Sequence, residues 1–477
     1  MTTLTADRPR SIERLLGDFA PDFDFVPAPP IPVGEYAERM RKVKREGVAA
    51  GLDALLVHTD TVGWFHAGNP YLRYLCDWMR EGVLVVPMDE DKEPVLVSFY
   101  TQSVILPPGG EPVGVERILQ VGAVGREYAD VPGDSGKKTV EAVAGVLSGF
   151  GLARGAIGVI GDKRSAPLKA GLAAALPGVS FSDQHAILDR MQRVRSPAEI
   201  AVTRTAAQLI SIATQAAYHV ARPGVTDYEV FAAFTLAQMA RGGETGDGYQ
   251  IGANEWGTHC GKPYGRVLRR GDLVNLYVSN VTYQGYTAQT ARMIALGALT
   301  ERQELVLDAC TRGVKAAEKL IRPGTLIRDL NNAAFGPYVE VGLLKDAEAR
   351  TMPYNWRTGD DGGPREIRRE YVPDADYEAQ GRRLMHVYPA LAGPHNPNLG
   401  HAVGMAGGQN AYNISSHNYD RLEEGMIFVL HTQWLEPQSA GCNVGDLYLV
   451  TADGFENLSR HTPLETYHVG VEIDLAG

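Results

Sequence analysis

Histidines in three separate segments are the side chains of this chain best suited to moving protons. They are His259 in the segment NEWGTHC, His401 in LGHAVGM and His431 in MIFVLHTQW. An imidazole titrates near neutral pH, so one ring can accept and return a proton within a single reaction cycle. The run around His431 is typical of a strand, in which alternate side chains share a face. We therefore expect Gln433 to lie on the same face as His431, with Thr432 and Trp434 on the other.

Motifs of two other catalytic chemistries are missing from the sequence. It has no Gly-x-Ser-x-Gly turn for a serine nucleophile and no Gly-x-x-x-x-Gly-Lys-Ser/Thr loop for a phosphate group. The four cysteines are scattered and form no Cys-x-x-Cys pair, which is typical of reduced thiols in an intracellular protein. We therefore expect a cytoplasmic protein whose chemistry does not depend on a serine nucleophile.

Composition limits the class of partner. The 477 residues carry a formal net charge of −11, whereas a surface that binds nucleic acid should be basic. No run of about 20 apolar residues is present, so no segment is expected to span a membrane. The N-terminus also lacks the apolar run of a signal peptide. These features favour a small-molecule substrate over nucleic acid or a membrane.

The elements that position these histidines show an internal repeat. The tripeptide Arg-Pro-Gly occurs at residues 222–224 and again at 322–324, one hundred residues later. Each copy ends a long helical pattern and precedes another, and a strand-rich stretch follows each helix pair. The pattern predicts two helix–helix–sheet halves related by a pseudo-twofold axis, with a site between the two sheets.

The rest of the chain divides into regions of different character. Strands alternate with helices in the first part, which is typical of an α/β domain. A long stretch rich in Arg, Asp, Tyr and Gly interrupts the second part, and we expect a lid, a binding loop or a dimer contact there. The predicted regions are an N-terminal extension (1–34), an N-terminal domain (35–190) and a C-terminal domain (191–477) with an insertion (346–398).

Five segments resemble, in order and spacing, the pita-bread family of creatinase, prolidase, aminopeptidase P and methionine aminopeptidase. They are NEWGTHCGKPYGRVLRRGDLV, YQGYTAQTAR, LGHAVGM, LEEGMIFVL and GDLYLVT. The resemblance covers about residues 190–470 well and the N-terminal part more loosely. It implies an α/β (α+β) fold, with a creatinase-like N-terminal domain followed by a pita-bread domain.

The resemblance also shows which ligands this chain lacks. Metal-dependent members supply two Asp, one His and two Glu around a pair of divalent ions. The corresponding positions here hold Val278, Gln289, His401, His431 and Gly445. Two divalent cations require several anionic oxygen ligands, so no dinuclear centre and no cofactor is expected. A single iron, zinc or manganese ion on His401 and His431 remains an alternative.

Creatinase provides a metal-free precedent within the resemblance, because it hydrolyses a C–N bond with a histidine that carries the proton. The counterpart of that residue here is His259. The two glutamates that hold the guanidinium group of creatine correspond to Ala291 and His431, so creatine itself is not expected as the substrate. His401 and Gln289 would orient the substrate and stabilise developing charge together with His431. The residues expected to add polar contacts are Tyr286 and Asn254.

An aromatic–arginine segment in the N-terminal domain resembles a further creatinase element. In creatinase this element reaches into the neighbouring subunit and holds the substrate carboxylate. Its counterparts here are Arg80, as the clamp, and Trp78, as a packing wall. A guanidinium group matches a carboxylate well. The resemblance thus implies a homodimer with a shared site.

The sequence predicts a metal-independent, creatinase-like hydrolase. It would cleave a C–N bond in a small polar substrate that carries a carboxylate, by acid–base catalysis on His259, His401 and His431. One alternative is a lyase, cyclase or isomerase on the same scaffold, and another is a hydrolase with one metal ion. A non-catalytic binding module of the same fold is the third alternative, because a fold does not fix a function.

Overall fold

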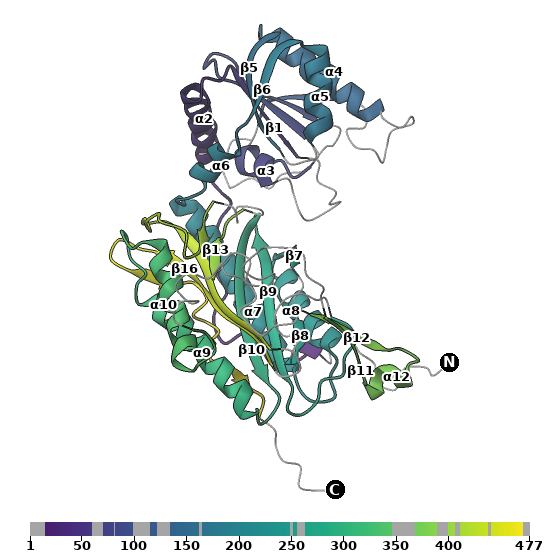
Figure 1. Ribbon diagram of the computed structural model, residues 1–477. Coiled ribbons are helices and arrows are strands. Elements are labelled where there is room, and N and C mark those ends of the chain that lie inside the picture. Colours follow the sequence, from purple (N-terminus) through teal and green to yellow (C-terminus); the bar gives the residue numbers. More distant parts are fainter. Residues whose placement is uncertain are drawn as a thin grey trace. The chain divides into compact units, whose positions relative to one another are not determined.

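The chain forms two compact units, which are described separately. The computed structural model describes residues 15–59, 70–80, 82–98, 115–121, 134–161, 165–248, 251–254, 263–345, 368–388, 399–405, 411–436 and 440–470 (Figure 1). Described residues between 28 and 202, with 404, 405 and 411, form the N-terminal unit. Those between 15 and 27, 203 and 403, and 412 and 470 form the C-terminal unit. The predicted domain boundary near residue 190 stays a prediction.

The N-terminal unit is built on a six-stranded mixed sheet. Its strands, in sheet order, are β4 (Arg117–Gln120), β3 (Val95–Ser98), β2 (Gly82–Pro87), β1 (Ala54–Thr59), β5 (Arg154–Ile160) and β6 (Gly178–Asp183). Strand β1 pairs in parallel with β5 and antiparallel with β2. The apolar residues 54–57 of β1 and the apolar run of β2 place these strands in the centre, buried on both faces, as the α/β prediction requires.

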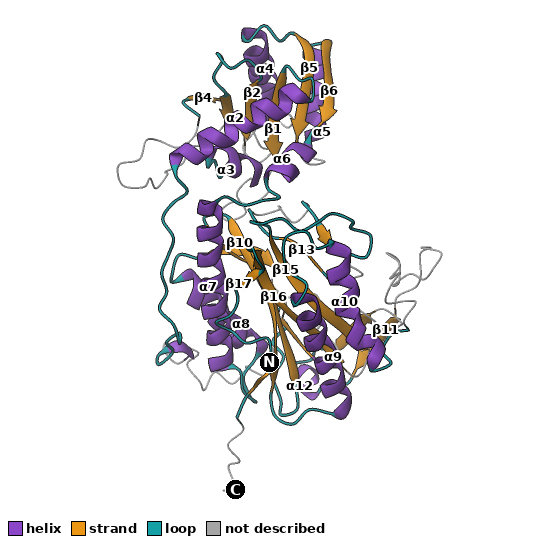
Figure 2. Ribbon diagram, turned by 90° about the vertical axis from the view of Figure 1, so that its left-hand side faces the viewer, coloured by secondary structure: helices purple, strands orange, loops and turns teal. Residues whose placement is uncertain are grey.

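Helices cover both faces of this sheet. They are α2 (Val33–Ala49), α3 (Pro70–Cys76), α4 (Asp134–Gly149), α5 (Ala166–Ala175) and α6 (His185–Met191). Residues of α4 and α5 share one apolar core with β1, β2, β3 and β5. Helices α2, α3 and α6 lie together on the other side of the sheet in Figures 1 and 2. The predicted α/β character of this part of the chain is confirmed.

The C-terminal unit is a ten-stranded sheet with two helix pairs. The helices are α7 (Pro197–Val220), α8 (Asp227–Met239), α9 (Glu301–Glu318) and α10 (Ile327–Glu340). The main strands, in sheet order, are β14 (Asn413–Ile414), β13 (Gly400–Ala402), β15 (Ile427–Glu436), β16 (Ala440–Val450), β10 (Tyr286–Ala295), β9 (Leu273–Tyr283) and β7 (Glu244–Gly248). The short strands β8 (Ile251–Ala253), β17 (Phe455–Asn457) and β18 (Tyr467–His468) pair with β9, β16 and β10, respectively. Figure 2 shows α7 and α8 against one half of the sheet and α9 and α10 against the other.

Backbone geometry confirms the predicted duplication. The glycine of each Arg-Pro-Gly copy has a left-handed backbone, with φ of 90° at Gly224 and 88° at Gly324. A helix, α8 or α10, begins three residues later in both copies. The matching backbone bonds are Gly224 N to Leu268 O (2.8 Å), Gly324 N to Leu422 O (2.8 Å), Asp227 N to Arg266 O (3.0 Å) and Ile327 N to Asp420 O (2.9 Å). The two halves therefore join helix to sheet in the same way.

Helices α9 and α10 pack against one face of β15. The hydroxyl of Thr432 donates to the carbonyl oxygen of Cys310 on α9, at 2.7 Å. The ring of Trp434 packs against that of Tyr338 on α10, with 5.8 Å between centroids. The predicted strand around His431 is confirmed, and Thr432 and Trp434 share the helix-covered face as expected.

An extended segment before the first unit packs on the C-terminal unit. Leu16, Phe19, Phe23 and Phe25 cover apolar residues of α7 and α8. Side-chain oxygens of α7 accept from the backbone of this segment, as in the 3.1 Å bond from Asp22 N to Gln215 Oε1. Phe23 also stacks on His461, with ring centroids 3.9 Å apart.

The predicted insertion includes a two-stranded hairpin of β11 (Arg368–Val372) and β12 (Leu384–Tyr388), which projects from the C-terminal unit in Figure 1. Between them lies the short helix α12 (Ala375–Ala379). Arg269 anchors it through Asp374 and Asp376, at 3.3 and 2.6 Å. The role of the insertion as lid, binding loop or dimer contact stays a prediction.

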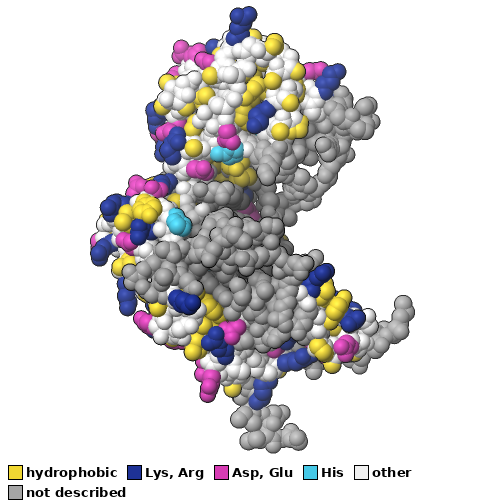
Figure 3. All heavy atoms as spheres, in the orientation of Figure 1, with side chains coloured by type: hydrophobic (Ala, Val, Ile, Leu, Met, Phe, Trp, Pro, Cys, Tyr) yellow, Lys and Arg dark blue, Asp and Glu magenta, His cyan; other side chains and the backbone are white. Residues whose placement is uncertain are grey.

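The surface of the described residues carries mixed charge. Figure 3 shows Lys and Arg side chains interspersed with Asp and Glu on the face that it presents. No helix within the described ranges is long and apolar enough to cross a membrane.

Candidate active site

A row of four residues crosses the middle of the ten-stranded sheet. In sheet order they are His431 on β15, Gly445 on β16, Ala291 on β10 and Tyr277 on β9. Each is the direct partner of the next in antiparallel register, so all four point to the same side of the sheet. Thr432 and Trp434 point to the opposite side, toward α9 and α10. We refer to the side that carries the row as the inner face.

Glycine at position 445 leaves the space that the side chain of His431 occupies. A Cβ atom there would lie 2.4 Å from the Cβ of His431 and 2.7 Å from the carbonyl oxygen of Leu430. Both distances are shorter than van der Waals contact, so any larger residue would force His431 or its strand to move. The position that the resemblance assigns to a carboxylate is therefore closed by the neighbouring strand at His431.

The imidazole of His431 contacts two other rings. Its centroid is 5.5 Å from that of Tyr277 and 5.9 Å from that of His401, edge-on in both pairs. Burial raises the pKa of Tyr277, so its hydroxyl keeps its proton at neutral pH. The three rings bring hydrogen-bond donors and acceptors together on the inner face.

His401 has a defined proton position. Its Nδ1 donates to the carbonyl oxygen of Ala402 at 2.9 Å, which leaves Nε2 as the acceptor in the neutral ring. Burial lowers the pKa of His401, because a charged imidazole loses hydration there. The ring is therefore held in the form in which Nε2 can accept a proton or a hydrogen bond.

Buried amides complete the inner-face cluster. Gln433 Nε2 donates to His431 Nδ1 at 2.7 Å, and Gln289 Nε2 donates to Tyr277 Oη at 2.5 Å. Asn443 lies directly opposite Gln433 in the β15–β16 register and so shares its face. The three amide side chains are at most 1% exposed. Within the described part of the chain, both glutamine Oε1 atoms and both polar atoms of Asn443 have no hydrogen-bond partner.

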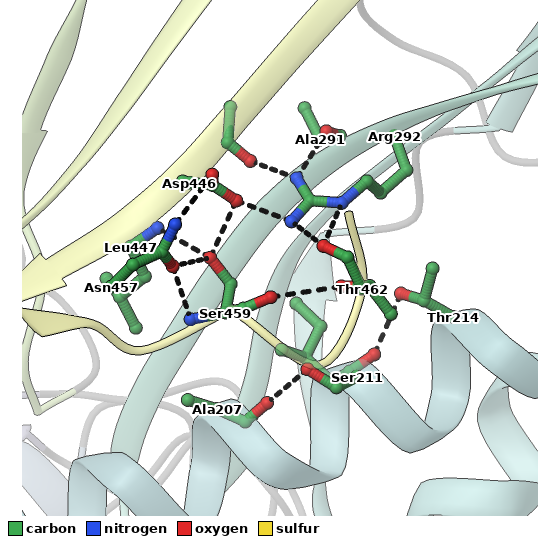
Figure 4. Close-up of polar contacts among 12 residues, drawn as sticks. Ala207, Ser211, Thr214, Ala291, Arg292, Asp446, Leu447, Asn457, Ser459 and Thr462 are labelled. Atoms are coloured by element: carbon green, nitrogen blue, oxygen red, sulfur yellow. Dashed lines mark hydrogen bonds and ion pairs between the residues drawn. The ribbon is translucent and has the colours of Figure 1, made fainter. Parts of the chain in front are cut away.

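The carboxylate of Asp446, the residue that follows Gly445, points away from this cluster. It binds the fully buried guanidinium group of Arg292, with 2.5 Å between Oδ1 and Nη2 (Figure 4). Ser459 and Asn457 donate to the same carboxylate at 2.7 and 2.9 Å. Arg292 Nη1 also donates to the carbonyl oxygen of Gly445 at 2.5 Å. This network fixes the backbone beneath the inner-face row and uses the charge of Asp446 in doing so.

A pair of divalent cations does not fit the donors of the inner face. The cluster offers imidazoles, amides and one phenol, all neutral, where two cations would require anionic bridging ligands. Val278 lies opposite Thr290 in the β9–β10 register and has no ligand atom in its side chain. Among the residues with described positions, no group of three His, Cys, Asp or Glu side chains is placed to hold a metal ion.

Asn254 and Tyr286 are two of the residues that were predicted to contact the substrate. Both amide atoms of Asn254 are engaged, since Nδ2 donates to Asp272 at 2.9 Å and Oδ1 accepts from Leu273 N at 3.0 Å. Asn254 therefore fixes the start of β9, in a left-handed backbone with φ of 55°. Tyr286 is fully buried at the start of β10. Contacts of either residue with a substrate stay predictions.

The remaining predicted site residues are His259, Arg80 and Trp78. His259 lies outside the described residues. Arg80 and Trp78 belong to the N-terminal unit, where Trp78 is buried at 7% exposure. Their proposed roles stay predictions.

Tyr277 and Asn443 were not predicted as site residues. Neither occupies a metal-ligand position of the resemblance, and both join the cluster only through the pairing of neighbouring strands. A signal for Asn443 was present, because residues two apart on a strand share a face and Asn443 is two residues before Gly445. No comparable signal pointed to Tyr277.

Comparison with known proteins gives one family and several relatives. The family model for metallopeptidase family M24 matches residues 201–452. The uncharacterized hydrolase/peptidase y4tL of Sinorhizobium fredii is 30% identical over 178 residues, which are 36% of this chain and 45% of that protein. The putative dipeptidase YkvY of Bacillus subtilis is 22% identical over 291 residues, 60% of this chain and 66% of that protein. The matches thus span less than two thirds of either relative.

Solved structures match over a larger share. The Xaa-Pro dipeptidase from Bacillus anthracis has a TM-score of 0.65 and 17% identity, and covers 91% of this chain and 100% of its own. Dipeptidase PepE from Mycobacterium ulcerans has a TM-score of 0.64 and 20% identity, with 92% and 99% covered. At these identities the likeness is one of fold.

Proposed function

The chain belongs to metallopeptidase family M24, and from this premise we propose that it hydrolyses a C–N bond of a small polar substrate without a metal ion. The observation that carries the proposal is the inner-face row, in which the strand at His431 closes the carboxylate position at Gly445. Relatives named as peptidases and dipeptidases favour hydrolysis as the reaction. The neutral donors of the cluster favour acid–base chemistry over metal activation.

The proposed mechanism divides roles among the three rings and His259. His401, with Nε2 free of a proton, accepts a hydrogen bond from the attacking water and orients it. His431 carries its proton on Nε2 when Nδ1 accepts from Gln433, and can donate to the oxyanion together with the Tyr277 hydroxyl. His259 moves the proton from water to the leaving nitrogen. Gln289 holds the phenol of Tyr277 in position.

The anchor for a substrate carboxylate is proposed to be Arg80. In creatinase the corresponding element reaches into the site of a neighbouring subunit, with Trp78 here as the packing wall, and this likeness supports a homodimer for the proposed enzyme. A guanidinium fork binds a carboxylate through two parallel hydrogen bonds. The variant Arg80→Ala should therefore raise KM with little effect on kcat. An unchanged KM would assign the anchor elsewhere.

Metal independence is tested by elemental analysis combined with chelation. The purified protein should contain well under one equivalent of iron, zinc or manganese and keep its activity after dialysis against a chelator. Activity that is lost on chelation and restored by one divalent ion would overturn the metal-free mechanism. Dipeptides and N-acyl amino acids form the substrate panel for this assay.

The reaction class needs a second measurement. A hydrolase run in isotopically labelled water places labelled oxygen in the carboxylate product, whereas a lyase, cyclase or isomerase does not. His259→Ala should abolish turnover while the unfolding midpoint stays near that of the parent protein. Full turnover in this variant would remove His259 from the mechanism.

A further inference from the structure

Asn443 has a buried side-chain amide that no described residue satisfies. Its side chain is fully buried, and neither its Oδ1 nor its Nδ2 has a hydrogen-bond partner within the described residues. Buried amide atoms in folded proteins are almost always paired, because an unpaired one loses its bonds to water without replacement. The backbone N–H of the same residue contacts the sulfur of Met293, 3.5 Å away, so the strand itself is held in place.

Two glutamines near Asn443 also have buried side-chain atoms without a hydrogen-bond partner among the described residues. Gln433, directly opposite in the register, and Gln289, bonded to Tyr277, each leave an Oε1 atom without a partner. The cluster therefore presents three acceptor oxygens and one donor nitrogen that the described protein does not use. A matching ligand must supply N–H groups to the oxygens and one acceptor to Asn443 Nδ2.

We propose that Asn443 recognises a cis-amide, in which a C=O and an N–H lie side by side, as in a lactam, cyclic imide or cyclic ureide. The side-chain amide of Asn443 presents one donor and one acceptor next to each other, so it pairs with such a group through two parallel hydrogen bonds. This inference rests on the proposed function, and it names the substrate class of the same site.

The geometry of peptide bonds excludes ordinary peptides from this pairing. A trans peptide bond points its C=O and N–H to opposite sides, so it can make one of the two bonds but not both. A bond to proline has no N–H at all. The pairing therefore favours a ring amide over the linear substrates in the names of the structural relatives.

The charge of the inner face supports the same class of ligand. The side chains gathered there are amides, imidazoles and a phenol, and burying a charged group among them without a counter-ion is costly. A lactam or ureide ring is neutral. A ring with a second N–H, such as a cyclic ureide, also supplies a donor for Gln433 or Gln289.

Hydrolysis of such a ring balances with one water molecule. The water oxygen bonds to the carbonyl carbon, the ring C–N bond breaks, and the nitrogen receives a proton. The product is a single open chain with a new carboxylate, and no oxidant or further reactant is needed.

Binding measured without turnover tests the inference. The full-length protein is titrated calorimetrically with hydantoin, and with its N,N′-dimethyl analogue, which has the same ring but no N–H. Hydantoin should bind at least ten-fold more tightly than the analogue. Asn443→Leu should weaken hydantoin binding at least ten-fold and should raise the melting temperature of the ligand-free protein, because an unpaired buried amide is replaced by an apolar group of similar size.

Asn332→Leu on α10 is the matched control. Asn332 also leaves a buried side-chain oxygen without a partner among the described residues, but it lies on a helix that covers the other face of the sheet. This variant should gain stability without any change in hydantoin affinity.

The outcomes separate the inference from the proposed function. Equal binding of hydantoin and its dimethyl analogue, no hydantoin binding by the parent protein, or unchanged affinity in Asn443→Leu would overturn the inference. Dipeptide hydrolysis without hydantoin binding would leave the proposed function standing alone. Hydantoin binding with no hydrolysis of any ring or peptide would support the inference and overturn the proposed function.

Discussion

The phenol ring of Tyr277 lies edge-on to the imidazole of His431, with 5.5 Å between centroids, although two strands separate β9 from β15. The two strands between them, β10 and β16, contribute Ala291 and Gly445 at this level. Small side chains on both middle strands let the rings meet above the sheet. The inner-face cluster therefore depends on the absence of large side chains at positions 291 and 445 as much as on the rings themselves.

Gly445→Ala should destabilise the protein. The added Cβ would meet the Cβ of His431 at 2.4 Å, and overpacking of this kind costs about 1–3 kcal/mol. Urea unfolding followed by circular dichroism measures the change. Gly454→Ala is the control, because nothing lies within 4 Å of a Cβ at that glycine. That substitution should change stability by less than about 0.5 kcal/mol.

The same clash predicts coupling between positions 445 and 431. Adding His431→Gly to Gly445→Ala should cost less than the sum of the two single changes, because glycine at 431 removes the Cβ that the new side chain would meet at 2.4 Å, whereas alanine at 431 would keep it. The double-mutant cycle should give a coupling of about 0.5–3 kcal/mol. Strictly additive effects would show that the clash is relieved by a different movement.

His401 should make stability pH-dependent. Burial lowers its pKa in the folded state, so the unfolded chain binds the proton more readily. The parent protein should therefore lose stability, relative to His401→Gln, as the pH falls below about 6.5, the ordinary pKa of histidine. Thermal unfolding of both proteins between pH 8 and pH 5 measures the difference. A difference that is constant with pH, or that favours the parent in acid, contradicts the prediction.

Asp446→Asn should be strongly destabilising. It leaves the guanidinium group of Arg292 fully buried without its counter-charge, and breaking one partner of a buried pair costs about 3–5 kcal/mol. The exposed pair of Arg312 and Glu340 is the control, since Glu340→Gln should cost only about 0–1 kcal/mol. Both changes are measured by urea unfolding, and equal costs would refute the structural role of the buried pair.

Phe23→Ala should loosen the extended segment from the C-terminal unit. The ring is half-buried and stacks on His461, so its loss should cost about 1–2 kcal/mol. Val26→Ala in the same segment is the control, because Val26 is 67% exposed and should be within about 0.5 kcal/mol of the parent. Protection of the amides of α7 from hydrogen exchange reports whether the segment has been released.

Sequence periodicity predicted those features that depend on local order. The strand around His431 and its two faces follow from alternation along one strand, and the duplication follows from two copies of one tripeptide. Both are properties of neighbouring residues or of internal similarity, which a single sequence contains.

Features that depend on pairing between strands distant in the sequence could not be predicted from the sequence. Tyr277 meets His431 only because Ala291 and Gly445 stand between them in register, and a sequence does not state its register. The missing carboxylates could be recognised from the sequence, but the reason that Gly445 has no side chain could not. That reason is the close approach of the neighbouring strand, at the Cβ and Cα of His431 and the carbonyl oxygen of Leu430.

The close approach of β15 to Gly445 also limits which residues position 445 can hold. The atoms that a new Cβ would meet are the Cβ and Cα of His431 and the carbonyl oxygen of Leu430, so the obstacle is the path of the neighbouring strand. Every residue at 431 except glycine carries the same Cβ. Recovery of an acidic ligand at 445 therefore requires a shift of β15 relative to β16, which a smaller side chain at 431 does not supply by itself.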